Sequence, residues 1–228
     1  MAPKIRVAIL DDHQGIIDGY QYRLSGATDI EVVATALYGE ELEPILSRKP
    51  VDVLLLDVHV PTSASNPNPY PILFQIPKLL QIYPDISVLV ISMHAQRTLI
   101  SAIMESGASG YILKDDQASI RELASIVRMV ANGGVHLSPL AYQQLLKRHT
   151  GELGQPLTPR QLEALSLCAA HPGASTAELA KKMNIAHSTM RNLLSGGYLK
   201  LKVRTRAEAV ARARQMGLIT PEVKLPRI

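Results

Sequence analysis

The stretch Val51-Asp52-Val53-Leu54-Leu55-Leu56-Asp57 decides how this chain folds, because it is an apolar run that ends abruptly in a carboxylate. Two other apolar runs also end abruptly in charged residues, one in the carboxylates of Asp11-Asp12 after residues 5–10 and one in the amine of Lys114 after residues 110–113. Such runs are typical of buried parallel strands. The carboxyl ends of parallel strands meet at one edge of an open α/β sheet, where ligands bind. Three carboxylates and an amine are therefore expected to converge on one site.

The first half of the chain alternates between strand-like and helix-like segments. Ser119 and Glu122 are expected to form the capping box of the last helix, which Gly133-Gly134 ends. This alternation predicts an α/β fold with a doubly wound, five-stranded parallel sheet. The expected strands are 5–10, 31–37, 51–56, 87–91 and 110–113, and the expected helices are 14–25, 39–48, 73–82, 96–106 and 119–132.

Residues 61–71 interrupt this alternation with four prolines and without apolar periodicity. We expect them to form a loop that begins close behind Asp57. A lid or partner-specific surface and a tolerated surface insertion are both compatible with this composition.

The second half of the chain reads as purely helical. Residues 133–155 are expected to be a linker with a short helix around Tyr142, Leu145 and Leu146, so the predicted domains are 1–132 and 156–228. Four short helices in a small all-α domain are expected, and the segments 176–183 and 188–201 form a helix-turn-helix pattern. The expected amino-terminal capping residues of these helices are Thr158, Ser175, Ser188 and Thr205.

Charge divides the chain in the same place. Residues 1–130 hold ten Lys/Arg against fifteen Asp/Glu, a balance of −5, and residues 131–228 hold fourteen against five, a balance of +9. A basic domain behind an acidic one indicates a polyanionic partner, and a solvated basic surface is the alternative. The single cysteine, Cys168, fits a core position in a reducing compartment. The sequence contains neither a signal-peptide pattern nor a membrane span, so we expect a cytoplasmic protein without a membrane partner.

The acidic strand ends indicate phosphoryl chemistry. A carboxylate such as Asp57 can accept a phosphoryl group if the repulsion between the two anions is relieved. A magnesium ion held by Asp11, Asp12 and Asp57 would relieve it, and Lys114 would add a further positive charge. Ser92 ends another apolar run and could bond a phosphate oxygen.

Residues 4–132 resemble the receiver domain of two-component response regulators. The resemblance is carried by Leu10-Asp11-Asp12-His13, Leu56-Asp57-Val58, Val90-Ile91-Ser92-Met93-His94 and the stretch from Gly107 to Asp115. It implies that Asp57 is the phosphoacceptor, with the phosphoryl group supplied by a sensor histidine kinase. It also implies that the backbone carbonyl of His59 helps Asp11 and Asp12 to hold Mg²⁺, that Ser92 and Tyr111 form a switch pair, and that Lys114 contacts the phosphoryl group. The side chains of His13 and His59 are expected to be exposed loop groups.

The helical half offers a surface suited to DNA. Arg191 and Asn192 lie at helical spacing with Ser195, and Arg and Asn side chains suit guanine and adenine edges in the major groove. Further motifs of this half are Leu157-Thr158-Pro159-Arg160-Gln161, Ala177-Glu178-Leu179-Ala180, Ser188-Thr189-Met190-Arg191, Lys200-Leu201-Lys202-Val203 and Arg206-Ala207-Glu208-Ala209-Val210. With these motifs, residues 156–219 resemble the LuxR-type helix-turn-helix of the NarL/FixJ subfamily. The resemblance implies binding to double-stranded DNA as a homodimer, with part of the dimer contact from 206–216. The DNA-contact candidates are Thr176, Lys181, Lys182, Ser188, Thr189, Arg191, Asn192, Ser195, Lys200 and Arg206.

Two positions depart from that pattern. Leu193 stands where a histidine is usual, and Gly196-Gly197 lies inside the expected recognition helix. Each interior glycine costs about 1 kcal/mol relative to alanine, so we expect the carboxyl half of this helix to kink or fray.

The sequence predicts a DNA-binding response regulator controlled by phosphorylation of Asp57, and not an enzyme. One alternative is an atypical regulator that acts through protein–protein interaction, with the two glycines impairing DNA readout. The other is a magnesium-dependent phosphohydrolase, against which His59 argues because a hydrolase would use an acid at this position.

Overall fold

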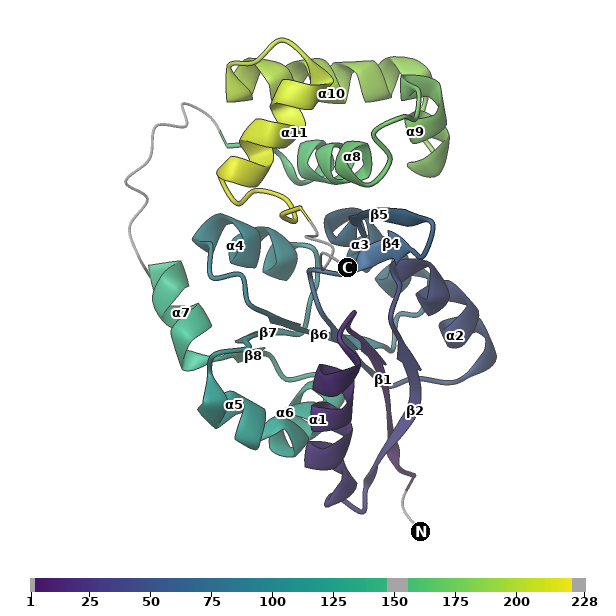
Figure 1. The fold of residues 1–228 in the computed structure, drawn as a ribbon, viewed down its shortest axis with the longest axis vertical. Helices are drawn as coiled ribbons and strands as arrows, with labels where there is room; N and C mark the ends of the chain where they lie inside the picture. The colour runs from purple at the N-terminus through teal and green to yellow at the C-terminus, as the bar shows by residue number, and fades with distance from the viewer. Residues whose placement is uncertain (1–2, 147–155, 223–228) are drawn as a thin grey trace.

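The structure is a computed structural model that describes residues 3–146 and 156–222, which form an α/β lobe and a helical lobe (Figure 1). Residues 147–155 of the expected linker lie outside the described residues. The α/β lobe confirms the doubly wound parallel sheet. Its strands are β1 (Ile5–Leu10), β2 (Ile30–Ala36), β3 (Val53–Leu56), β6 (Ser87–Ser92), β7 (Gly110–Leu113) and β8 (His136–Leu137), in the order β2-β1-β3-β6-β7-β8.

The sheet has six strands, and the prediction of five is wrong. The additional strand β8 pairs in parallel with β7, and the helix α7 (Pro139–Leu146) follows it and packs against α4. Both lie within the segment expected to be a linker. A two-residue strand is too short to show a hydrophobic period, so the sequence pattern could not reveal it.

The other helices of this lobe lie close to their expected positions and cover both faces of the sheet (Figure 1). Two buried hydrophobic clusters occupy the two faces, with side chains alternating between them along β1 and β3. The helices are α1 (Gln14–Ser25), a 3₁₀ turn η1 (Gly39–Glu41), α2 (Leu42–Arg48), α3 (Ile72–Ile82), α4 (Arg97–Glu105), α5 (Gln117–Arg121) and α6 (Leu123–Ala131).

The proline-rich segment after Asp57 is a hairpin, and the prediction of a loop is wrong. Strands β4 (Pro61–Ser63) and β5 (Asn66–Pro69) pair antiparallel to each other in a separate two-stranded sheet. The hydroxyl of Thr62 donates to the carbonyl of Asn68 over 2.9 Å. Prolines fit such a strand because an isolated hairpin has edge positions whose N–H groups need no ladder partner.

The expected helix 119–132 is two helices with a different cap. Asp116 caps α5, since its carboxylate accepts from the N–H of Ser119 at 3.2 Å. Ser119 itself is buried inside α5, and Glu122 lies at the junction between α5 and α6. The expected capping box of Ser119 with Glu122 is therefore wrong, because the better acceptor stands three residues earlier.

The helical lobe contains α8 (Pro159–Ala170), α9 (Thr176–Lys182), α10 (His187–Leu201) and α11 (Arg206–Gln215). Thr158, Ser175 and Thr205 form the expected capping boxes. Ser188 does not cap α10, because the helix begins one residue earlier and Ala186 occupies the cap position. Among the described residues, no helix is long and apolar enough to cross a membrane.

Helix α10 is continuous from His187 to Leu201, through Gly196 and Gly197, so its carboxyl half does not fray as expected. The two glycines face α8 in different ways. A Cβ atom on Gly197 would lie 3.8 Å from Leu157 and 3.9 Å from Leu165, at ordinary van der Waals distance. A Cβ atom on Gly196 would lie 2.7 Å from the side-chain nitrogen of Gln161, which belongs to the capping box of α8.

We therefore expect Gly197→Ala to stabilise the helical lobe by about 1 kcal/mol, because alanine has the higher helix propensity and its methyl group fills available space. Gly196→Ala is the matched control and should gain less stability, because its methyl group displaces the side chain of Gln161. Urea unfolding followed by circular dichroism measures both. A destabilised Gly197→Ala protein would contradict the space that the structure leaves for a methyl group between Gly197 and the side chains of Leu157 and Leu165.

Candidate functional site

The three charged strand ends meet as predicted. Lys114 directly follows β7, and its Nζ lies 2.7 Å from an oxygen of Asp11 and 2.7 Å from an oxygen of Asp57. The two carboxylates are buried, and the Lys114 side chain is 12% exposed. They come together because β1, β3, β6 and β7 are parallel and in register, so that their carboxyl ends form one edge.

Asp12 lies at the rim of this cluster and is half-buried. Ligand atoms of Asp11, Asp12 and His13 lie within 4.8 Å of one another, close enough to hold one metal ion. The His13 ring is mostly exposed, and its Nδ1 lies 2.7 Å from a carboxylate oxygen of Asp12. Carboxylate oxygens are the ligands that Mg²⁺ prefers, so the donor set of Asp11, Asp12 and Asp57 suits a hard divalent cation.

Burial and like charge shape the electrostatics of the site. Desolvation, followed by repulsion from Asp57, raises the pKa of Asp11 above its ordinary value. For Lys114, desolvation lowers the pKa, but attraction to Asp57 and Asp11 outweighs it and the net pKa is raised. The amine is therefore charged at neutral pH, and two buried carboxylates share one ammonium group.

The predicted switch residues lie on the adjacent strands. The Ser92 hydroxyl at the end of β6 accepts from the N–H of His94 at 3.2 Å. The Tyr111 ring is fully buried, and its hydroxyl donates to the carbonyl of His94 over 2.7 Å. Both side chains are thus bonded to the loop that follows β6, and the tyrosine already occupies an inward position.

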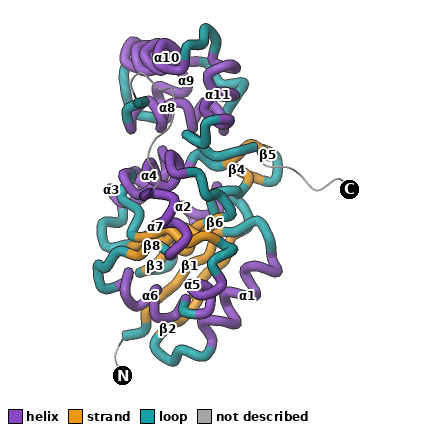
Figure 2. Tube along the Cα trace, turned by 90° about the vertical axis from the view of Figure 1, so that its left-hand side faces the viewer, coloured by secondary structure: helices purple, strands orange, loops and turns teal. Residues whose placement is uncertain are grey.

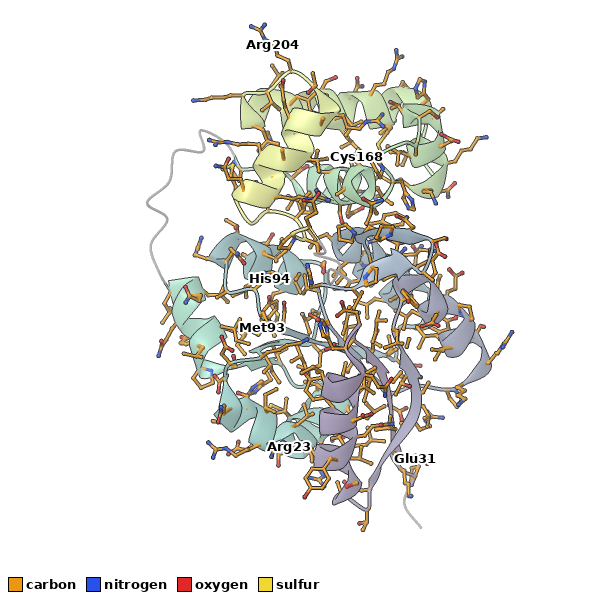
Figure 3. The ribbon with its side chains drawn as sticks, viewed as in Figure 1. Arg23, Glu31, Met93, His94, Cys168 and Arg204 are labelled. Carbon is orange, nitrogen blue, oxygen red and sulfur yellow. The ribbon has the colours of Figure 1, made fainter. Side chains whose placement is uncertain are left out.

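His59 connects the loop that follows Asp57 to the other lobe. Its backbone N–H donates to Asp57 Oδ1 over 3.2 Å, while its ring Nε2 lies 2.8 Å from the carbonyl oxygen of Glu222. The ring also contacts that of His94 edge to face, with centroids 5.6 Å apart. Figure 3 shows His94 near the junction of the two lobes. The sequence carries no sign of this contact, since it joins residues 163 positions apart.

The predicted DNA-reading residues share the exposed face of α10. Helix α10 lies at the end of the helical lobe farthest from the α/β lobe, with α8 between them (Figure 1). This exposed face also carries Leu199, which is 79% exposed and is absent from the DNA-contact candidates predicted from the sequence. The exposed candidates on α10 are Ser188, Thr189, Arg191, Asn192 and Ser195.

The remaining DNA-contact candidates divide into two groups. Lys181 and Lys182 are exposed in the last turn of α9. Lys200 donates to the carbonyl of Pro156 and to the side chain of Gln161. The guanidinium of Arg206 donates to the hydroxyl of Thr176 over 2.9 Å and to a backbone carbonyl. The side chains of Thr176, Lys200 and Arg206 therefore make contacts within the helical lobe in this structure, and are not free to contact a phosphate group.

Comparisons with known proteins agree with both lobes. Residues 7–127 match the family model of the response regulator receiver domain, and residues 155–213 match that of the bacterial regulatory proteins of the luxR family. The transcriptional regulatory protein MctR of Rhizobium johnstonii is 31% identical over 218 residues, which cover 96% of this chain and 97% of MctR. DegU of Brevibacillus brevis is 29% identical, with 95% of each chain covered.

Solved structures show the same two-part fold. The response regulator ChrA of a heme-sensing two-component system shares 30% identity at a TM-score of 0.50, covering 95% of this chain and 99% of ChrA. RcsB of Salmonella enterica serovar Typhimurium, bound to the promoter rprA with a phosphomimetic, matches in fold at 20% identity and a TM-score of 0.62, covering 92% and 98%. The chain belongs to the response regulators that join a receiver domain to a LuxR-type DNA-binding domain, and it is a transcription regulator rather than an enzyme.

Proposed function

We propose that Asp57 accepts a phosphoryl group from the phosphohistidine of a sensor kinase, and that this modification controls DNA binding. The observation that carries the proposal is the placement of Lys114 between the buried carboxylates of Asp11 and Asp57, 2.7 Å from each. In the reaction, an Asp57 oxygen attacks phosphorus while the N–P bond breaks. The electron pair of that bond returns to the imidazole nitrogen, which takes up a proton.

The surrounding groups are arranged to receive the added charge. Lys114 supplies an ammonium group, and the N–H of His59 already points at Asp57 Oδ1. The Ser92 hydroxyl can turn from its bond with His94 to donate to a phosphoryl oxygen. We assign Asp11, Asp12, Asp57 and the backbone carbonyl of His59 as the groups that hold Mg²⁺, which would neutralise part of the phosphoryl charge when bound.

The helical lobe then reads DNA. The exposed face of α10 presents Arg191 and Asn192 to base edges, with Lys181 and Lys182 as phosphate contacts. A homodimer would place two such helices on paired half-sites. The cytoplasmic location expected from the sequence stays a prediction.

Fluorescence-anisotropy titrations on genomic DNA fragments, with and without beryllofluoride and Mg²⁺, test this function. We expect specific binding that beryllofluoride strengthens. Arg191→Ala should weaken binding to the specific fragment by about 1–3 kcal/mol and relax its sequence preference, because a base contact is lost. Lys181→Ala is the matched control, since a phosphate contact should weaken all fragments equally and reduce the salt dependence. Failure to bind any fragment in either state would favour the protein-interaction alternative.

A further inference from the structure

Helix α8 is buried from both sides. Every residue from 161 to 170 is buried, although the helix includes the polar residues Gln161, Glu163 and Ser166. One side of α8 packs against α10 and α11. The opposite side packs against α3, α4 and β5 of the receiver lobe, and one continuous cluster of buried hydrophobic residues extends from the receiver core into the helical lobe. The two lobes therefore share a core.

The hairpin β4–β5, which follows Asp57 in the sequence, contributes to this contact. It lies directly beneath the helical lobe (Figure 2). From β5, the side-chain amide of Asn66 donates to the carbonyl of Ala170 over 3.1 Å, which satisfies an unpaired carbonyl at the carboxyl end of α8. The insertion thus supplies a specific polar contact to the other lobe, which gives a role to a segment whose purpose the sequence left open.

Residues 216–219, which follow α11 in the sequence, make a second contact with the receiver lobe. The hydroxyl of Thr98 in α4 lies 3.0 Å from the carbonyl oxygen of Met216 and 2.9 Å from that of Gly217. Gly217 has φ +63°, and a Cβ atom on it would lie 2.6 Å from side-chain carbons of Gln96. Leu218 and Ile219, which follow, are buried. The backbone at 216–219 is therefore seated closely on the receiver lobe.

The DNA-reading face is free in this arrangement. Helix α10 lies on the side of α8 opposite the receiver lobe, and Arg204 projects away from that lobe at the outer end of the molecule (Figures 1 and 3). The side chains of Arg191, Asn192 and Ser195 are exposed while the lobes are in contact. Access to a major groove thus requires no separation of the lobes.

We propose that the hairpin β4–β5, α3 and α4 form a lasting docking surface for α8 and residues 216–219, and that the protein binds DNA with its lobes docked. This inference rests on the proposed function and specifies its regulation. Phosphorylation at Asp57 then acts on the docked unit as a whole, for example on how two copies pair, and not by releasing the helical lobe from the receiver lobe.

A disulfide across the contact tests the proposal. A Cβ atom on Gly217 would lie 3.4 Å from Thr98 Oγ1, which is close to the reach of a disulfide from position 98. The double variant Thr98→Cys/Gly217→Cys is treated with oxidised glutathione, which takes up the two electrons and two protons released by the thiols. Native Cys168 is 1% exposed and stays out of the reaction. The single variant Gly217→Cys controls for strain at the positive φ.

We expect the disulfide to form and the oxidised protein to bind DNA within about twofold of the same protein reduced with dithiothreitol, with and without beryllofluoride. A more than tenfold weaker Kd for the oxidised form would overturn the proposal, and so would a pair that fails to oxidise, because positions 98 and 217 would then not be adjacent in solution. Wild type is titrated in parallel. If wild type also fails to bind DNA, the proposed function itself is wrong, and this outcome is distinct from a defect confined to the oxidised form.

Discussion

Lys114→Met is expected to destabilise the receiver lobe by about 3 kcal/mol at pH 7.5 in the presence of a metal chelator. The substitution leaves the buried carboxylates of Asp11 and Asp57 without their shared ammonium group, and removal of one partner from a buried ion pair commonly costs 3–5 kcal/mol. Urea unfolding measures the change. Lys78→Met is the matched control, since Lys78 is 41% exposed and 3.4 Å from Glu43, and it should leave stability nearly unchanged.

The pH dependence identifies the cause. The pKa of Asp11 is already raised by burial and by Asp57, and attraction to Lys114 opposes this rise. In Lys114→Met the opposition is lost, so the pKa of Asp11 rises further and the folded state binds a proton more readily than the unfolded state. The loss in the free energy of unfolding relative to wild type should therefore become smaller as the pH falls towards 4, and Mg²⁺ should reduce this loss at pH 7.5. A deficit that is the same at both pH values and insensitive to Mg²⁺ would indicate lost packing rather than unbalanced charge.

The sequence predicts the acidic site well because each of its parts is local. An apolar run followed by a charged residue indicates a buried strand and its carboxyl end. Parallel pairing then places the carboxyl ends of these strands at one edge of the sheet. Asp11, Asp57 and Lys114 therefore appear together in the structure as they do in the prediction. The predicted capping boxes at Thr158 and Ser175 are confirmed for the same reason, since a cap involves residues only three positions apart.

The errors lie where structure depends on distant partners. Strand β8 is defined by its pairing with β7, and the hairpin β4–β5 forms despite prolines that locally indicate a loop. The sequence predicts that Gly196-Gly197 destabilises the carboxyl half of α10, yet α8 packs against that segment and supports it.

Asp57→Asn is expected to abolish phosphorylation completely, because an amide oxygen lacks the negative charge needed to attack phosphorus. The two carboxylate oxygens of Asp57 have different donors, since Oδ2 lies 2.7 Å from Lys114 Nζ and Oδ1 accepts from the N–H of His59. We propose that the acyl phosphate forms on this carboxylate. Asp52→Asn is the matched control. Asp52 stands at the opposite end of the same stretch, where it pairs with Arg6, and this variant should be phosphorylated like wild type.

Intact-mass spectrometry after incubation with acetyl phosphate and Mg²⁺ tests this site most directly. We expect wild type and Asp52→Asn each to gain one phosphoryl group, Asp57→Asn to gain none, and wild type treated with a chelator to gain little. An equal adduct on wild type and Asp57→Asn would contradict the assignment of the phosphoacceptor.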